Sequence, residues 1–226
     1  MTALILQARM DSVRLARKCL LPLGGRPLLF RVMEGLSEVN CERKILACPE
    51  DCLDIFSSLA KEAGFEIISG PKDDVLVRYC IAIRYCNADR IIRATGDNPF
   101  VFSDAASIIN NEAVELGVDY AGYPGLPYGA GVEAVNAEAL LRAEKDAVTA
   151  YDRENVCPYL YGNPKIFRLH LPYAPVRWQG RDMRVTVDTE EDYERAQTLY
   201  AALADFPLAE RSRGETVIKA YRSCKL

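Results

Sequence analysis

A basic segment follows the first apolar run of the chain. Residues 8–18 read A-R-M-D-S-V-R-L-A-R-K and hold four cations, Arg9, Arg14, Arg17 and Lys18, against one acid. The local charge is therefore 4 − 1 = +3, in a chain whose net charge is −4. A loop with several cations and exposed backbone amides suits the phosphates of a nucleotide. On charge alone, a solvated loop without a ligand is an equally good interpretation.

Two further segments place single carboxylates where a metal could bind. Asp97 lies in R-A-T-G-D-N-P (93–99), and Asp188 lies in V-T-V-D-T-E-E-D (185–192). Both follow apolar runs that read as strands, and carboxylates are preferred ligands of Mg²⁺. Each has a plainer interpretation, because the first segment is also a typical turn and the second a typical helix cap.

These side chains need a scaffold, and the first half of the chain predicts one. Strands are expected at 2–7, 43–48, 65–70 and 89–95, and helices at 27–36, 53–64, 73–86 and 103–117, the last capped by Ser103. This alternation is typical of an α/β protein with a mostly parallel sheet flanked by helices. Ligands of such sheets bind beyond the carboxyl ends of the strands, where all three segments are expected.

The second half is less regular. It predicts short strands at 118–123 and 131–135, helical structure over 136–162, strands at 165–171 and 182–188, a helix over 189–203 capped by Thr189, and a final helix within 207–222. No linker separates the halves, so a single domain over 1–226 is expected. Its nucleotide-binding half spans about 1–117, and its acceptor-binding half about 118–226.

Composition argues against several other functions. The acidic balance, with a pI near 5.3, disfavours a general nucleic-acid binder. The sequence has neither an apolar run of about 20 residues nor a signal-peptide pattern, so we expect a cytoplasmic protein that does not span a membrane. The eight cysteines lack zinc-site spacing and are expected to be reduced, and His170 is the only histidine. There is no P-loop motif, and the absence of Asp-x-Asp weakens a glycosyltransferase assignment.

Five blocks in order resemble one known family. They are L-I-L-Q-A-R-M-D-S-V-R-L-A-R-K-C-L-L-P-L-G-G-R-P-L-L (4–29), D-D-V-L-V-R-Y (73–79), R-A-T-G-D-N-P (93–99), R-E-N-V-C-P-Y (153–159) and V-D-T-E-E-D-Y-E (187–194). The chain resembles the acylneuraminate/Kdo-type cytidylyltransferases over roughly residues 4–203. It is most similar to the branch called the spore coat polysaccharide biosynthesis protein F family.

The resemblance implies a nucleotide-diphospho-sugar transferase fold, which is GT-A-like and Rossmann-like. It implies transfer of CMP from CTP to a sugar or sugar-acid acceptor with release of pyrophosphate, for surface glycan synthesis. It also implies Mg²⁺ as cofactor and a homodimer, as in many relatives.

Residue roles follow from the same resemblance. The catalytic residues would be Arg14, Lys18 and Asp97, and the metal ligands Asp97 and Asp188. Acceptor-binding residues would be Glu133, Glu154 and Tyr159. Nucleotide-binding residues would be Gln7, Ala8, Arg9, Met10, Ser12, Arg14, Lys18, Asp74, Arg78, Gly96 and Asp97.

The chain departs from the family pattern at defined positions. Where relatives read R-L-P-G-K, this chain has Arg14-Leu15-Ala16-Arg17-Lys18, so a bulky cation replaces a flexible glycine. The acceptor segment Tyr128–Glu133 has lost two acids that relatives carry. A catalytically weak nucleotide-binding regulator or scaffold of the same fold is therefore the main alternative, and a GT-A-type glycosyltransferase is a third.

Overall fold

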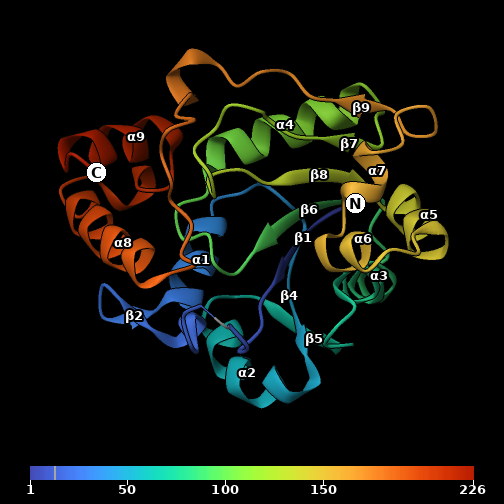
Figure 1. The fold of residues 1–226 in the computed structure, drawn as a ribbon, viewed down its shortest axis with the longest axis horizontal. Coiled ribbons are helices and arrows are strands. Elements are labelled where there is room, and N and C mark those ends of the chain that lie inside the picture. Colours follow the sequence, from blue (N-terminus) through green and yellow to red (C-terminus); the bar gives the residue numbers. More distant parts are fainter. Residues whose placement is uncertain (13) are drawn as a thin grey trace.

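The computed structural model describes residues 1–12 and 14–226, so residue 13 of the basic loop lies outside the described part. The structure is built on a seven-stranded sheet in the order β5-β4-β1-β6-β8-β7-β9. Figure 1 shows these strands across the middle of the molecule, with α8 and α9 on the left and α3 and α5 on the right. The strands are β1 (Thr2–Gln7), β4 (Arg43–Pro49), β5 (Glu66–Gly70), β6 (Arg90–Thr95), β7 (Tyr120–Ala121), β8 (Glu133–Asn136) and β9 (Leu169–His170).

The sheet is mostly parallel, as predicted. Strands β5, β4, β1 and β6 run parallel to their neighbours, and β8 reverses direction between β6 and β7. Strand β7 then pairs in parallel with β9. A small antiparallel ribbon, β2 (Pro22–Leu23) with β3 (Arg26–Pro27), lies outside this sheet. The parallel strands therefore end at one edge, and their carboxyl ends carry the basic loop and the Asp97 turn.

Helices cover both faces of the sheet because successive strand residues point to opposite sides. Leu4, Leu6 and Ile92 face one buried cluster, and Ile5 and Ile91 face the other. The first cluster is completed by α1 (Leu28–Leu36), α2 (Leu53–Glu62), α4 (Ser103–Glu115), α8 (Glu190–Leu203) and α9 (Gly214–Ser223). The second is completed by α3 (Val75–Cys86), α5 (Ala137–Asp146) and α7 (Pro158–Tyr161), with α6 (Ala150–Asn155) packed on α3.

Several local predictions are wrong. The segment 182–188, predicted as a strand, forms only an isolated bridge, between Tyr128 and Arg184. The predicted strand 165–171 shortens to the two residues of β9. Ser103 does not cap α4, because Phe102 holds the cap position and the Ser103 hydroxyl bonds Ser212 instead. The final helix, predicted over much of 207–222, is present as α9, although it begins only at Gly214.

Local capping places two important segments. The Asp74 carboxylate accepts a hydrogen bond from the Val77 amide at 3.0 Å and begins α3. Thr189 and Asp192 form a reciprocal capping box that begins α8 immediately after Asp188. Because the cap uses Thr189 and Asp192, the Asp188 side chain stays available to face the edge of the sheet. No helix in residues 1–12 and 14–226 is long and apolar enough to cross a membrane.

Candidate active site

A cleft of about 1020 Å³ lies at the carboxyl edge of the parallel strands. It is large enough for a nucleotide and a second small molecule, since ligand pockets commonly measure about 300–1,000 Å³. Most of the predicted site residues line it: Gln7, Ala8, Arg9, Ser12, Arg14, Lys18, Gly96, Asp97, Glu133, Glu154 and Asp188. The structure therefore brings together segments that lie far apart in the sequence.

The centre of the cleft is a lysine held between two carboxylates. The Lys18 Nζ donates to Asp97 Oδ2 at 3.0 Å and to Asp188 Oδ1 at 3.0 Å. A third bond, at 2.9 Å, goes to the carbonyl oxygen of Val187. The ammonium thus uses all three of its donors. Asp97 and Asp188, predicted from separate motifs, converge on a single positive charge.

Burial and ion pairing have opposite effects on the pKa values of Lys18 and Asp188. Burial by itself would lower the pKa of Lys18, but Asp97 and Asp188 more than offset that effect and raise it. Burial would raise the pKa of Asp188, yet the neighbouring cations, Lys18 foremost, bring it below its usual value. Both groups are therefore charged at neutral pH, and the pairing is ionic.

The backbone fixes the spacing of the two carboxylates. The Val187 amide donates to the carbonyl oxygen of Asp97 at 2.9 Å, so the two acidic segments are bonded directly to each other. Lys18 begins a short 3-10 helix (Lys18–Leu20) that follows the basic loop. This main-chain bond takes the place of the strand pairing predicted for 182–188.

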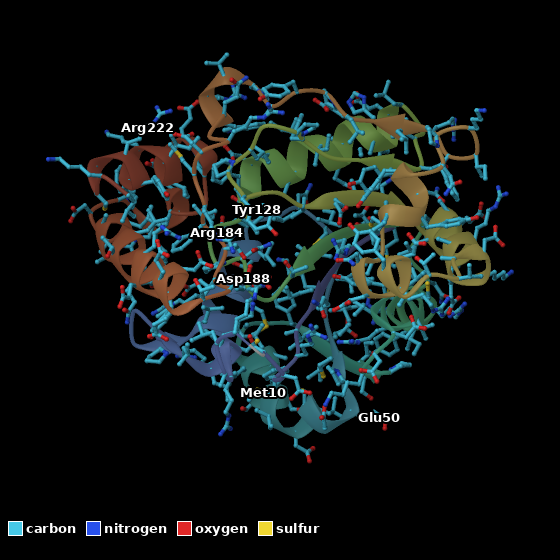
Figure 2. The ribbon with its side chains drawn as sticks, viewed as in Figure 1. Met10, Glu50, Tyr128, Arg184, Asp188 and Arg222 are labelled. Carbon is cyan, nitrogen blue, oxygen red and sulfur yellow. The ribbon has the colours of Figure 1, made fainter. Side chains whose placement is uncertain are left out.

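Asp188 is surrounded by further cations. Arg184 Nη2 donates to its Oδ2 at 2.8 Å, and Arg14 Nη2 lies 3.1 Å from its Oδ1. The Arg184 guanidinium also lies 4.8 Å from the centre of the Tyr128 ring. Figure 2 shows Tyr128, Arg184 and Asp188 close together beside α8. Arg184 was not predicted, although its spacing of four residues from Asp188 was visible in the sequence.

Gly96 is required by close approach of the backbone. A Cβ atom at this position would lie 2.8 Å from the Ala8 Cβ and 3.1 Å from the Gln7 carbonyl oxygen. The Gly96 amide donates to that same oxygen at 2.8 Å. The turn that carries Asp97 is therefore held tightly against the start of the basic loop.

The basic loop is anchored on its other side as well. Lys72 forms an ion pair with Asp11, and the Cys19 thiol lies 3.2 Å from the Arg9 carbonyl oxygen. Burial raises the pKa of Cys19 to about 12, so this thiol is a packing group rather than a nucleophile. Arg9 reaches across the cleft to Glu154, with 3.6 Å between charged atoms.

Four predicted site residues do not line this cleft. Arg78 is fully buried and donates to the carbonyl oxygens of Pro71 and Lys72, while approaching Gln7 at 3.5 Å. Asp74 pairs with Arg153 and lines a smaller neighbouring pocket. Met10 packs on the core. Tyr159 packs against Phe167, with ring centres 6.0 Å apart.

Glu133 lies in a polar cluster on the far side of the cleft. It is opposite Arg93 in the antiparallel pairing of β8 with β6, and the two side chains form an ion pair. Tyr120, on the neighbouring strand, donates to Glu133 Oε1 at 2.7 Å. Arg93 and Tyr120 could not be predicted as partners of Glu133, because their contacts with it depend on the reversed direction of β8. Directly opposed residues of antiparallel strands share a face and interact.

Aromatic side chains form much of the remaining wall. The tyrosines that line the cleft are Tyr120, Tyr123, Tyr128, Tyr151 and Tyr161. Glu112 supports Tyr123, because the Tyr123 hydroxyl donates a hydrogen bond to the Glu112 carboxylate at 2.9 Å. The same carboxylate lies 3.0 Å from the Nε2 atom of His170. The single histidine therefore supports the wall and does not line the cleft.

Comparison with known proteins identifies the family. The cytidylyltransferase family model matches residues 3–214. The chain belongs to the cytidylyltransferase family. It is 31% identical over 210 residues to the spore coat polysaccharide biosynthesis protein SpsF of Bacillus subtilis. The aligned segment covers 90% of this chain and 88% of the relative. The resemblance inferred from the five sequence blocks is thus confirmed.

Solved structures show the same fold. A cytidylyltransferase from Leptospira borgpetersenii superposes with a TM-score of 0.88 at 23% identity, covering 99% of this chain and 93% of that one. A CMP:2-keto-3-deoxy-manno-octonic acid synthetase complexed with CTP gives a TM-score of 0.66 at 14% identity, covering 88% and 98%. The predicted nucleotidyltransferase fold of this family member is therefore confirmed.

Proposed function

We propose that this cytidylyltransferase transfers CMP from CTP to a sugar or sugar-acid acceptor and releases pyrophosphate, in the synthesis of a surface polysaccharide. One observation carries the proposal: Asp97 and Asp188 converge on one cationic centre, at 3.0 Å each, beside the basic loop. The relative SpsF is named for spore coat polysaccharide biosynthesis, and a structural neighbour was solved with CTP.

The transfer makes one bond and breaks one. An acceptor oxygen attacks the α-phosphorus of CTP, the bond to the bridging oxygen breaks, and pyrophosphate leaves with the electron pair. If the attacking oxygen belongs to a hydroxyl group, its proton is released to water. Lys18 and Arg14 border the cleft at the basic loop, where their charges would stabilise the leaving pyrophosphate. The segment that lines the cleft at Gln7, Ala8, Arg9 and Ser12 would hold the rest of the nucleotide.

The carboxylates fit a magnesium ion. Asp97 and Asp188 already share one cation, which shows that two hard oxygen ligands reach the same place. Mg²⁺ is commonly bound through one or two carboxylates together with substrate phosphates. When bound, it would supply charge neutralisation at the reacting phosphate.

The opposite side of the cleft would receive the acceptor. Glu133 and Glu154 supply hydrogen-bond acceptors for hydroxyl groups, although each is also engaged by an arginine. Tyr151 and Tyr161 offer exposed ring faces against which a sugar can pack. Tyr159 is left out of this group because it is not among the residues that line the cleft.

The assembly and location of the enzyme are part of the proposal. The homodimer is proposed from the family resemblance alone. Sedimentation of the purified protein would reveal its mass in solution. Eight free cysteines support a reducing compartment such as the cytoplasm.

Replacement of one carboxylate tests the function. Pyrophosphate release would be measured with CTP, Mg²⁺ and a panel of nonulosonic and 3-deoxy-sugar acids. We expect Asp97→Asn to lower the rate by about 10²–10³-fold while the protein stays folded, because it weakens the charge centre. Asp205→Asn, on an exposed turn after α8, is the matched control and should keep the full rate.

The outcomes separate the alternatives. An unchanged rate in Asp97→Asn would remove Asp97 from the mechanism. Binding of CTP by the wild type without pyrophosphate release for any acceptor would favour the regulator or scaffold interpretation. Preference for a nucleotide-sugar over free CTP would favour a glycosyltransferase.

A further inference from the structure

The place that a divalent cation would take is already filled by a side chain. The Lys18 ammonium lies between Asp97 and Asp188, and the Lys18 side chain is only 12% exposed. We propose that Lys18 blocks metal binding in the nucleotide-free enzyme and gives up the carboxylates only when phosphates enter the cleft. The inference rests on the proposed function, because it takes Asp97 and Asp188 as the metal ligands.

The hydrogen bonds of Lys18 show why the exclusion would be effective. Its three donors are satisfied by Asp97, Asp188 and the Val187 carbonyl, at 2.9 to 3.0 Å. An ammonium bound in this way neutralises charge at both carboxylates and is held more firmly than the partner of an exposed ion pair. A metal that used the same carboxylate oxygens would have to displace it.

The surrounding charge also opposes a lone metal ion. Asp188 already receives Arg14 at 3.1 Å and Arg184 at 2.8 Å, in addition to Lys18. A divalent cation entering alone would therefore meet three nearby positive charges. A water-exposed pair of acids would present no such barrier.

A triphosphate would reverse this balance. It offers Lys18 and Arg14 new oxygen partners, and it offers the metal phosphate ligands beside the freed carboxylates. The long flexible stem of lysine permits such an exchange without movement of the backbone. Metal and nucleotide would then favour each other's binding by equal factors, as linkage requires.

Mn²⁺ is the probe for the test, because its free ion gives an electron paramagnetic resonance signal that disappears on binding. Titrations would be made on the full chain without nucleotide, for the wild type, Lys18→Met and Lys18→Arg. We expect Lys18→Met to bind Mn²⁺ at least about tenfold more tightly, because a unit charge next to the carboxylates is lost. Lys18→Arg keeps that charge and should bind as weakly as the wild type.

A double variant shows whether the gain belongs to this site. Lys18→Met combined with Asp97→Asn should lose the added affinity. Equal Mn²⁺ affinity in the wild type and Lys18→Met, including no measurable binding in either, would overturn the proposal. So would a gain that persists in the double variant.

The wild type alone gives a second, independent decision. Tight nucleotide-free binding of one Mn²⁺, with a Kd below about 10 μM, would overturn the proposal even if Lys18→Met failed to fold. Because no nucleotide is present, this experiment is separate from the test of function. Pyrophosphate release by a wild type that binds Mn²⁺ tightly would keep the function and reject the block by Lys18.

Discussion

Arg17 occupies a backbone conformation that favours glycine. Its φ is 53°, in the left-handed region that only glycine adopts without steric cost. The loop therefore has, at Arg17, a backbone conformation that a glycine would adopt without strain. Arg17 is exposed and is not among the residues that line the cleft, so nothing in the structure explains its side chain.

Arg17→Gly should stabilise the protein. The left-handed conformation destabilises a non-glycine residue by about 1–2 kcal/mol. Glycine removes this strain but raises the entropy of the unfolded chain, which destabilises the fold by about 0.4–1 kcal/mol. We expect a net rise of roughly 0.5–1 kcal/mol in the free energy of unfolding, measured in urea. Arg17→Ala, which keeps the Cβ atom, is the control. A variant with glycine no more stable than the one with alanine would contradict the argument.

The start of α8 shows how an element positions the site. The Asp192 side chain is 4% exposed and accepts hydrogen bonds from Arg184 and Arg195, at 2.8 and 2.7 Å. It also accepts from the amides of Asp188 and Thr189. Burial would raise its pKa, but these bonds bring it well below the usual range. The position of Asp188, immediately before α8, therefore depends on the negative charge of Asp192.

This dependence predicts a loss of stability in acid. Because the folded-state pKa of Asp192 is depressed, its contribution is complete above about pH 4 and is lost as the pH falls through the folded value. Asp192→Asn should lower the free energy of unfolding by about 1.5–3 kcal/mol at pH 7. Between pH 5 and pH 2, the free energy of unfolding of this variant should fall by less than that of the wild type. Denaturation in urea at each pH would measure both effects.

The matched control lies on the same helix turn. Glu191 also pairs with Arg195, but its side chain is 82% exposed. Glu191→Gln should therefore change stability by less than about 0.5 kcal/mol. Parallel pH profiles of the wild type and Asp192→Asn would show that the acid effect arises elsewhere.

The regular elements were predictable because their signals are local. Thr189 begins α8 with the capping pattern that its sequence predicted. The strand prediction for 182–188 was wrong, although the segment does alternate apolar and polar residues. In the structure this segment bonds to the Asp97 turn and forms a single bridge, and it does not join the sheet. No local pattern indicates which distant backbone such a segment will meet.

At the scale of the whole molecule, the cleft belongs to both halves of the chain. The first half supplies the basic loop and Asp97, and the second supplies Glu133, Glu154 and Asp188. The predicted division at about residue 117 therefore marks a change in sequence pattern, while the sheet runs continuously from β5 to β9. The pairing of Arg93 with Glu133, which crosses this division, could not be predicted without the strand order.

Nucleotide binding to this cleft should raise the stability of the whole fold. A ligand at 100 times its Kd adds about 2.7 kcal/mol if it binds only the folded state. We expect a thermal shift with CTP and Mg²⁺ together, smaller shifts with UTP, ATP or GTP, and none with Mg²⁺ alone. Asp188→Asn should lose the metal-dependent part of the shift. An equal response to all four nucleotides would contradict recognition of the cytosine base.

The main-chain bond between Val187 and Asp97 also has a consequence for the order of synthesis. On the ribosome, the basic loop and the Asp97 turn emerge long before residue 187, and contacts of such separation close late in folding. The growing chain therefore holds Lys18 and Asp97 without Asp188 for much of its translation. A nascent chain shorter than about 188 residues should gain no protection from CTP, however well its first four parallel strands have formed.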